Sequence, residues 1–271
     1  MCKMCSMTGE APSDPEVPSP GCEFLRVAAL VGVFAAQLML ASHFAKAPPK
    51  YCFTRPFWLD EFHTLALVKE ERADQLLSKL SRGADFNPPG LHFALWIVSK
   101  VTSVSDEVLL RSFSCAVGLC GIVATYFLLR LRFSWRVSWV GVLGMWSSSP
   151  HLVQQMFEGR TYSFWFASIA IFCLLVSVRA KGSWQIVCIA AVAALTCSIH
   201  YLGIIVLGLI AASQFCCNFR DVRMRWLLGV ALAAGVITMI ASLPLYSGQR
   251  AAVPVATWIP APTFGASVAF I

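Results

Sequence analysis

Long apolar stretches, separated by short polar segments, run through almost the whole chain. Seven of these stretches approach the roughly 20 mostly apolar residues that a helix needs to cross a bilayer. They lie near residues 24–43, 109–129, 137–153, 161–178, 184–200, 201–218 and 226–246. The pattern therefore predicts an all-α multi-pass membrane protein with about seven transmembrane helices.

An eighth apolar segment, residues 88–101, is shorter and opens with Pro88-Pro89-Gly90. Whether it crosses the membrane decides the orientation of every later span. Lys and Arg residues near span ends are retained in the cytoplasm. If the segment does not cross, the later cytoplasmic loops hold eight such residues and the opposing loops hold only Arg160 and Arg250. The eight are Arg130, Arg132, Arg136, Arg179, Lys181, Arg220, Arg223 and Arg225.

If residues 88–101 crossed, this charge bias would reverse, so we expect an interfacial or half-buried helix there. It then belongs to a long first extracytoplasmic loop, about residues 45–107, in which alternating Leu and charged residues are typical of short amphipathic helices on a membrane surface. The N-terminus is cytoplasmic in this arrangement. Residues 1–23 contain four prolines among acidic and Ser residues and are expected to form a disordered cytoplasmic tail.

Composition supports this class of protein. The chain is 58% hydrophobic and only 13% charged, whereas soluble domains carry roughly 25% charged residues. Its net charge of +7 is spread over short runs between apolar segments rather than over one basic face, which argues against a nucleic-acid partner. Most of the eleven cysteines lie inside apolar stretches, where thiols behave as small hydrophobic groups.

Polar groups from five places along the chain converge on the extracytoplasmic side in this topology. They are Asp60-Glu61-x-His63, Asn87, Arg111, Glu158-x-Arg160-x-Tyr162 and His200-Tyr201. Because the loops are oriented from the cytoplasmic basic residues alone, this convergence is a partly independent observation. We expect an active site on this face.

Asp60 and Glu61 follow the apolar triplet Phe57-Trp58-Leu59. Burial at the membrane boundary would raise a carboxyl pKa and favour a general base. The alternative is structural, because Asp at an N-cap and an acid in the first turn are typical of helix starts. Together with His63 the two carboxylates could also bind a divalent cation, although no metal motif is clear.

The other candidates also have two interpretations each. Arg111, in the first turn of a span, could snorkel to the interface or hold a lipid phosphate. Arg160 could pair with Glu158 or bind a ligand. Asn87 is a polar tip fixed by the two prolines after it, either as a helix start or as a binding group. His200 and Tyr201 mark a turn so tight that the flanking helices form a hairpin, and His200 could titrate or contact a phosphate.

The ordered motifs resemble a known family. They are Trp58-Leu59-Asp60-Glu61, Asn87-Pro88-Pro89-Gly90-Leu91, Arg111-Ser112-Phe113-Ser114, Glu158-Gly159-Arg160-Thr161-Tyr162 and His200-Tyr201. In order and spacing they resemble the integral-membrane glycosyltransferases of the GT-C superfamily, specifically glycosyltransferase family 39, the bacterial relatives of protein O-mannosyltransferases and of the lipid A aminoarabinose transferase. The resemblance covers about residues 24–215.

The resemblance implies an enzyme of the plasma (inner) membrane. It would transfer a sugar from a polyprenyl-phosphate donor, with inversion, to a lipid, glycan or protein acceptor on the extracytoplasmic face. Asp60 then looks like the general base, and Glu61 would orient the acceptor or a cation. The candidates for the donor phosphate are Arg111, Arg160 and His200, with the remaining polar groups of this face as further substrate contacts.

This sequence departs from the family pattern in two ways. Relatives often carry His or Lys at the position of Asn87, and an amide cannot supply that charge. Relatives also usually continue through more spans into a soluble outer domain, so residues 24–271 are expected to be a shortened form or a fragment of such a module.

Two rival functions differ in class. One is a transporter-like or lipid-binding membrane protein without chemistry, in which the arginines hold a head group. The other is a structural subunit that keeps the fold without activity. Transporters place polar groups near the bilayer midplane, whereas here these groups lie at span ends, which favours interfacial chemistry.

Overall fold

A computed structural model of the chain describes residues 20–44, 59–148, 155–178 and 182–252. The chain divides into two compact units, residues 1–46 and 47–271. The first unit contains one described helix, α1 (Pro20–Phe44). All regular structure in the described residues is helical, which confirms the predicted all-α class.

The helix of the first unit begins earlier than expected. Residues 1–19 of the predicted tail lie outside the described residues, but Pro20 already belongs to α1. Proline is well tolerated in a first helical turn. The carboxylate of Glu23 lies in the same turn, where its negative charge interacts favourably with the helix dipole. It also accepts a 2.7 Å hydrogen bond from Arg26.

Among the described residues, three helices are long and apolar enough to cross a membrane, in segments Pro20–Gln37, Val108–Arg130 and Val222–Ala252. The last two belong to α6 (Asp106–Arg130) and α12 (Val222–Ala252). Shorter apolar helices occupy the other predicted spans: α7 (Trp135–Ser147), α9 (Thr161–Ser177), α10 (Trp184–Ile199) and α11 (Gly203–Asn218). The described part of the chain thus contains three candidate membrane spans, by length and composition, of the seven expected.

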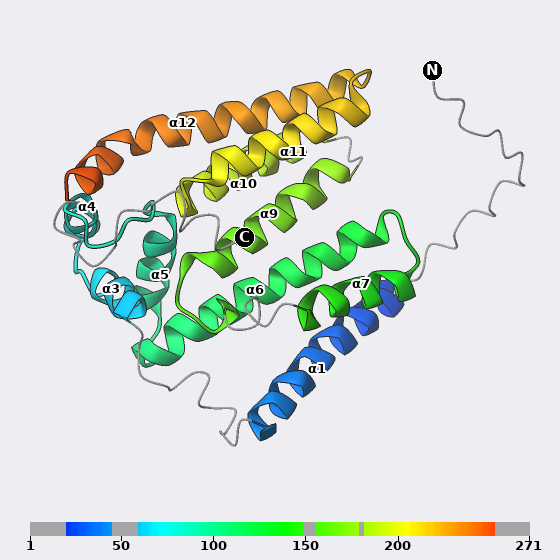
Figure 1. Ribbon diagram of the computed structural model, residues 1–271, viewed down its shortest axis with the longest axis horizontal. Helices are drawn as coiled ribbons and strands as arrows, with labels where there is room; N and C mark the ends of the chain where they lie inside the picture. The colour runs from blue at the N-terminus through cyan, green and yellow to red at the C-terminus, as the bar shows by residue number, and fades with distance from the viewer. Residues whose placement is uncertain (1–19, 45–58, 149–154, 179–181, 253–271) are drawn as a thin grey trace, which may run out of the picture. The chain divides into compact units, whose positions relative to one another are not determined.

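In the second unit, α9 lies beside α6, and α10 lies against both α9 and α12 (Figure 1). The contact between α6 and α9 is close because Gly121 has no side chain. A Cβ at this position would lie 2.6 Å from the Phe166 ring and 2.9 Å from the Ala167 backbone. Small residues permit such approaches between apolar helices. Phe172, Ile189 and Leu228 belong to the buried core of α9, α10, α11 and α12.

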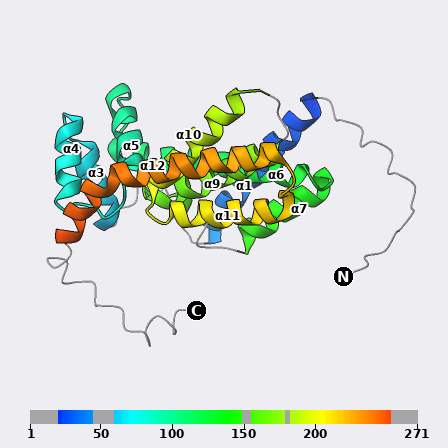
Figure 2. The same ribbon diagram turned by 90° about the horizontal axis from the view of Figure 1, so that it is seen from above.

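Three short helices of the predicted first loop gather at one end of this bundle, as both views show: α3 (Leu59–Val68), α4 (Ala73–Ser81) and α5 (Gly90–Val101) (Figure 1 and Figure 2). The 12 residues of α5 extend only about 18 Å, against a hydrocarbon core of about 30 Å. Leu91 and Leu95 of α5 are buried against α6 and α9 residues. The helix therefore caps the bundle rather than extending through it.

Two connections follow from local sequence. The stretch 137–153 is not one long helix, because α7 ends at Ser147. Ser148, Ser149 and Pro150 follow in the sequence, and a residue before proline is disfavoured in helical conformation. The tight turn expected at His200 and Tyr201 is confirmed, since only three residues separate α10 from α11.

Candidate active site

A cavity of about 410 Å³ lies at the end of the bundle where α3, the connection between α4 and α5, the start of α9 and the end of α12 meet. Its polar lining comes from segments far apart in the sequence. The charged and polar residues are Asp60, His63, Thr64, Arg82, Asp85, Asn87, Arg160 and Thr161. Four of the predicted candidates therefore meet in one place, namely Asp60, His63, Asn87 and Arg160.

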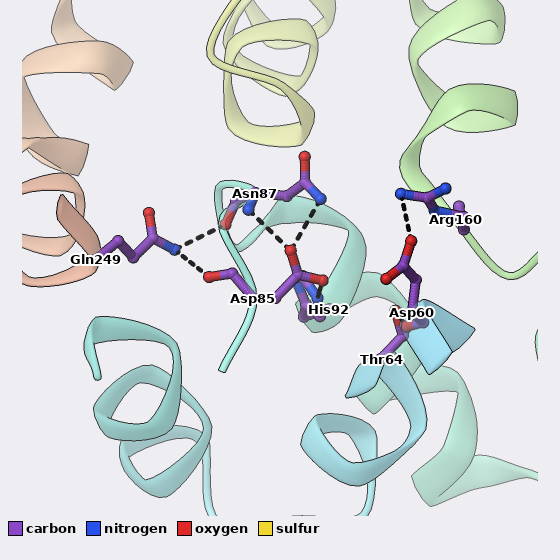
Figure 3. Close-up of polar contacts among 7 residues, drawn as sticks. All are labelled: Asp60, Thr64, Asp85, Asn87, His92, Arg160 and Gln249. Carbon is purple, nitrogen blue, oxygen red and sulfur yellow. Dashed lines mark hydrogen bonds and ion pairs between the residues drawn. The ribbon is translucent and has the colours of Figure 1, made fainter. Parts of the chain in front are cut away.

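Asp60 and Arg160 form an ion pair at the cavity wall (Figure 3). Asp60 lies in the first turn of α3, and Arg160 is the N-cap of α9. Arg160 Nη2 donates to Asp60 Oδ2 over 2.8 Å, and the two side chains stay 32% and 42% exposed, respectively. The guanidinium also lies 5.1 Å from the centroid of the Tyr162 ring. Arg160 thus pairs with Asp60 and not with Glu158.

Glu61 turns away from the cavity. It forms a bidentate pair with Arg111, in which Nε and Nη2 donate over 3.0 and 2.8 Å, and both side chains are fully buried. The Gly159 N–H adds a third donor, 3.1 Å from Glu61 Oε1. Consecutive helical residues point roughly 100° apart, so Asp60 faces the cavity while Glu61 faces the interior of the bundle. Arg111 has the buried partner that a charge in an apolar helix requires.

Asp85 organises the loop that forms another cavity wall. Its Oδ1 accepts hydrogen bonds from the backbone and side-chain nitrogens of Asn87, both 2.9 Å long. Its Oδ2 lies 3.1 Å from Nε2 of the fully buried His92. Burial would by itself raise the pKa of Asp85, but His92 and the Asn87 donors outweigh it and hold this pKa below its ordinary value. Asp85 is therefore ionised at neutral pH.

Gln249 of α12 holds the same loop from the opposite side (Figure 3). Its amide nitrogen donates to the carbonyls of Asp85 and Asn87 over 2.8 and 3.1 Å, and its oxygen accepts from the Tyr201 hydroxyl over 2.6 Å. Burial, with the nearby Tyr246 and Asp85, raises the pKa of Tyr201 to about 12. Tyr201 therefore remains a donor at neutral pH and contributes to positioning the loop.

The remaining candidates lie outside the cavity lining. His200 stacks on Trp165 with 4.7 Å between ring centroids, and its Nδ1 accepts from the Leu202 N–H. Burial lowers the pKa of His200, which favours the neutral ring. Glu158 is buried with only 5% exposure. His200 is thus held by the Trp165 ring and the Leu202 backbone, away from the cavity lining.

The Asp60, Glu61 and His63 side chains do not gather around one point, because Glu61 is held by Arg111 inside the bundle. Within the described part of the chain, no cluster of three or more His, Cys, Asp or Glu side chains is placed to hold a metal ion. The arrangement does not fit the divalent cation that the sequence left open.

Sequence reasoning missed Arg82, Asp85 and Gln249. A signal existed for Asp85, because Asp often accepts a hydrogen bond from the backbone two residues later, and the chain reads Asp85-Phe86-Asn87. Arg82 ends α4 before Gly83, whose φ of +83° makes the turn into the cavity loop. Nothing local marks Gln249, which lies 164 residues from Asp85.

Comparisons of the chain with family models, curated proteins and solved structures found no significant match. The family resemblance therefore rests on the ordered motifs themselves.

Proposed function

We propose that this protein is a membrane glycosyltransferase that transfers a sugar from a polyprenyl-phosphate donor to an acceptor hydroxyl on the extracytoplasmic face of the plasma membrane. The proposal keeps the predicted topology, in which the N-terminus is cytoplasmic and residues 88–101 do not cross the membrane. The short helices α3, α4 and α5 then lie in the first extracytoplasmic loop. The cavity that they form with the ends of α9 and α12 is the active site.

The observation that carries this proposal is a partly exposed carboxylate paired with a guanidinium group, in a cavity that a second arginine also lines. Asp60 supplies the carboxylate, and Arg160 and Arg82 supply the positive charge. The side chain of Arg82 makes no hydrogen bond or ion pair with any other described residue. Thr161 at the start of α9 also lines the cavity, and a helix N-terminus favours anions. A phosphate and an acceptor hydroxyl are the two groups that this combination suits.

The chemistry is an inverting displacement. Asp60 takes the proton of the acceptor hydroxyl, whose oxygen then bonds to the anomeric carbon of the sugar as the bond from that carbon to the phosphate oxygen breaks. The polyprenyl phosphate leaves with the bond's electron pair, and Arg160 stabilises the negative charge that develops on it. The donor phosphate also competes with Asp60 for Arg160, which leaves the carboxylate facing the acceptor.

Arg111 and Glu61 act as the support of this site and not as substrate contacts in our proposal. Their buried pair anchors the first turn of α3 to α6, and the Gly159 N–H ties the same carboxylate to the residue that precedes Arg160. Because the pair is shared by both segments, it fixes the position of Asp60 relative to Arg160. The loop that carries Arg82 and Asn87 is likewise held in position by Asp85, His92 and Gln249.

Arg160→Gln tests the donor side of this proposal. A charge-assisted hydrogen bond contributes about 1.5–3 kcal/mol, so we expect kcat/KM for the polyprenyl-phosphate sugar to fall by about 10- to 100-fold. The measurement is transfer of radiolabelled sugar by membranes that contain the full chain, at varied donor concentration. Arg160→Lys, which keeps the charge and loses the planar fork, should recover part of the loss.

Arg72→Gln is the matched control, because Arg72 forms a similar pair with Asp74, 2.9 Å long, on the exposed surface of α4. It should leave transfer unchanged. Equal rates in Arg160→Gln and Arg72→Gln would contradict a donor-binding role for Arg160. The rival function is lipid binding without chemistry. It predicts that the unchanged chain transfers no sugar, and that Arg160→Gln weakens only the binding of the polyprenyl-phosphate sugar.

A further inference from the structure

A second cavity, of about 510 Å³, lies at the opposite end of the helical bundle. The ends of α6, α9 and α11 and the starts of α10 and α12 surround it, far along these helices from α3, α4 and α5 (Figure 1). The proposed transfer site uses none of its residues. Its lining combines buried apolar side chains with two arginines and several amides, a combination that a purely structural gap does not need.

The floor of this cavity is an ordered polar group. The side chain of Gln185 is buried, and its amide nitrogen donates to the carbonyls of Leu175 and Val178, both over 2.7 Å. Its oxygen accepts from Arg223 Nη2 over 2.8 Å. The α9 carbonyls therefore fix the amide, and the amide in turn fixes the guanidinium of Arg223 in the cavity wall.

Arg132 supplies a second cation from the opposite wall. Its side chain is exposed, lines the cavity and makes no hydrogen bond or ion pair among the described residues. Among the described lining residues Asp221 is the one carboxylate, and it accepts from the Met224 N–H and so caps the start of α12. The lining carries an excess of one positive charge, which suits a monoanion.

The apolar part of the lining indicates what else the ligand contains. Val176 and Leu227 are buried deep in the wall, while Leu131 and Phe133 line the rim and stay 44% and 51% exposed. Apolar rims of this kind are costly in water and suited to acyl chains. We propose that this cavity binds the phosphate head group of an anionic phospholipid, with the acyl chains along Leu131 and Phe133.

A soluble phosphate compound would use the same guanidinium groups, but it would leave the apolar rim exposed. Basic pockets between transmembrane helices are known to suit anionic lipid head groups. The site is separate from the proposed transfer site, so its occupancy does not depend on the glycosyltransferase assignment.

Native mass spectrometry of the full chain, purified in a neutral detergent, tests this site with three probes. They are dioctanoyl phosphatidylglycerol, dioctanoyl phosphatidylcholine and glycerol 3-phosphate. We expect retention of the phosphatidylglycerol and at least about tenfold weaker retention of the other two, since each lacks either the net charge or the acyl chains. Equal retention of phosphatidylcholine, or of glycerol 3-phosphate, would overturn the proposal.

Arg132→Gln should weaken phosphatidylglycerol retention by about tenfold, which is the usual effect of losing one charge-assisted hydrogen bond. Arg136→Gln is the matched control, because Arg136 lies near the same end of the bundle, stacks on Trp135 and does not line the cavity. It removes the same charge and should change retention by no more than about twofold. Equal losses in the two variants would show a general attraction to basic residues and contradict a built site.

Discussion

Membranes that contain Asp60→Asn should transfer sugar at least about 100-fold more slowly than membranes with the unchanged chain, because general-base catalysis contributes about 10²- to 10⁴-fold. An amide cannot accept the acceptor proton, yet it keeps the shape of the carboxylate and can still meet Arg160. The variant should therefore insert and bind donor normally. The measurement is initial-rate transfer of labelled sugar, normalised to the amount of inserted protein.

Asp74→Asn is the control for this variant. Asp74 also lies in the first turn of a short helix of the same loop and pairs with an arginine, but it does so on the exposed surface. The hydrogen bonds from Arg72, together with its positive charge, hold the pKa of Asp74 below its ordinary value. Transfer should be unchanged in Asp74→Asn. Full activity in Asp60→Asn would rule out Asp60 as the base.

Glu61→Leu should destabilise the protein by about 3–5 kcal/mol, which is the usual cost of removing one partner of a buried ion pair. The fully buried Arg111 would lose both hydrogen bonds to Glu61, and the Gly159 N–H would lose the same acceptor. The measurement is the midpoint of unfolding in detergent, followed by circular dichroism at 222 nm.

The double variant Glu61→Leu/Arg111→Leu separates the cost of an unpaired charge from the cost of lost packing. It should be more stable than Glu61→Leu alone, because the buried guanidinium of Arg111 has also been removed, but it should transfer sugar slowly, because α3 has lost its anchor to α6. Arg72→Leu, which breaks the exposed pair, should leave the midpoint almost unchanged. A double variant that is less stable than Glu61→Leu would contradict the pair's role as a mutually compensating anchor.

Much of the fold could be predicted from the apolar pattern. Apolar stretches of about 20 residues have few alternatives to a helix, and α6, α9, α10, α11 and α12 lie where the pattern placed them. The turn at His200 follows from the absence of any polar spacer between two apolar stretches. The helices of the first loop were also expected as a group, although their packing against the bundle was not.

The candidate site could be predicted only in part. Sequence placed Asp60, Asn87 and Arg160 on one face, and the structure brings these three to one cavity. The pattern cannot tell which of two adjacent carboxylates faces a cavity, because that depends on how α3 is rotated against α6. For the same reason Arg111 looked like a substrate contact, although it is the buried partner of Glu61.

Contacts between distant segments account for the site residues that the sequence did not predict. Gln249 reaches Asp85 and Asn87 only because the end of α12 packs against the first-loop helices, and no local motif encodes that contact. Arg82 lines the cavity because the turn at Gly83 directs the following loop along it. Long-range packing of this kind has no periodic signature in one sequence.

The most direct test of the central claim is a photocrosslink between the full chain and a polyprenyl phosphate that carries a diazirine next to its phosphate, with adducts mapped by peptide mass spectrometry. We expect adducts on the cavity segments around Asp60, residues 82–87 and Arg160, and loss of these adducts when unlabelled polyprenyl-phosphate sugar is added. Adducts confined to the opposite end of the bundle, around Arg132 and Arg223, or adducts that the donor does not displace, would contradict the claim.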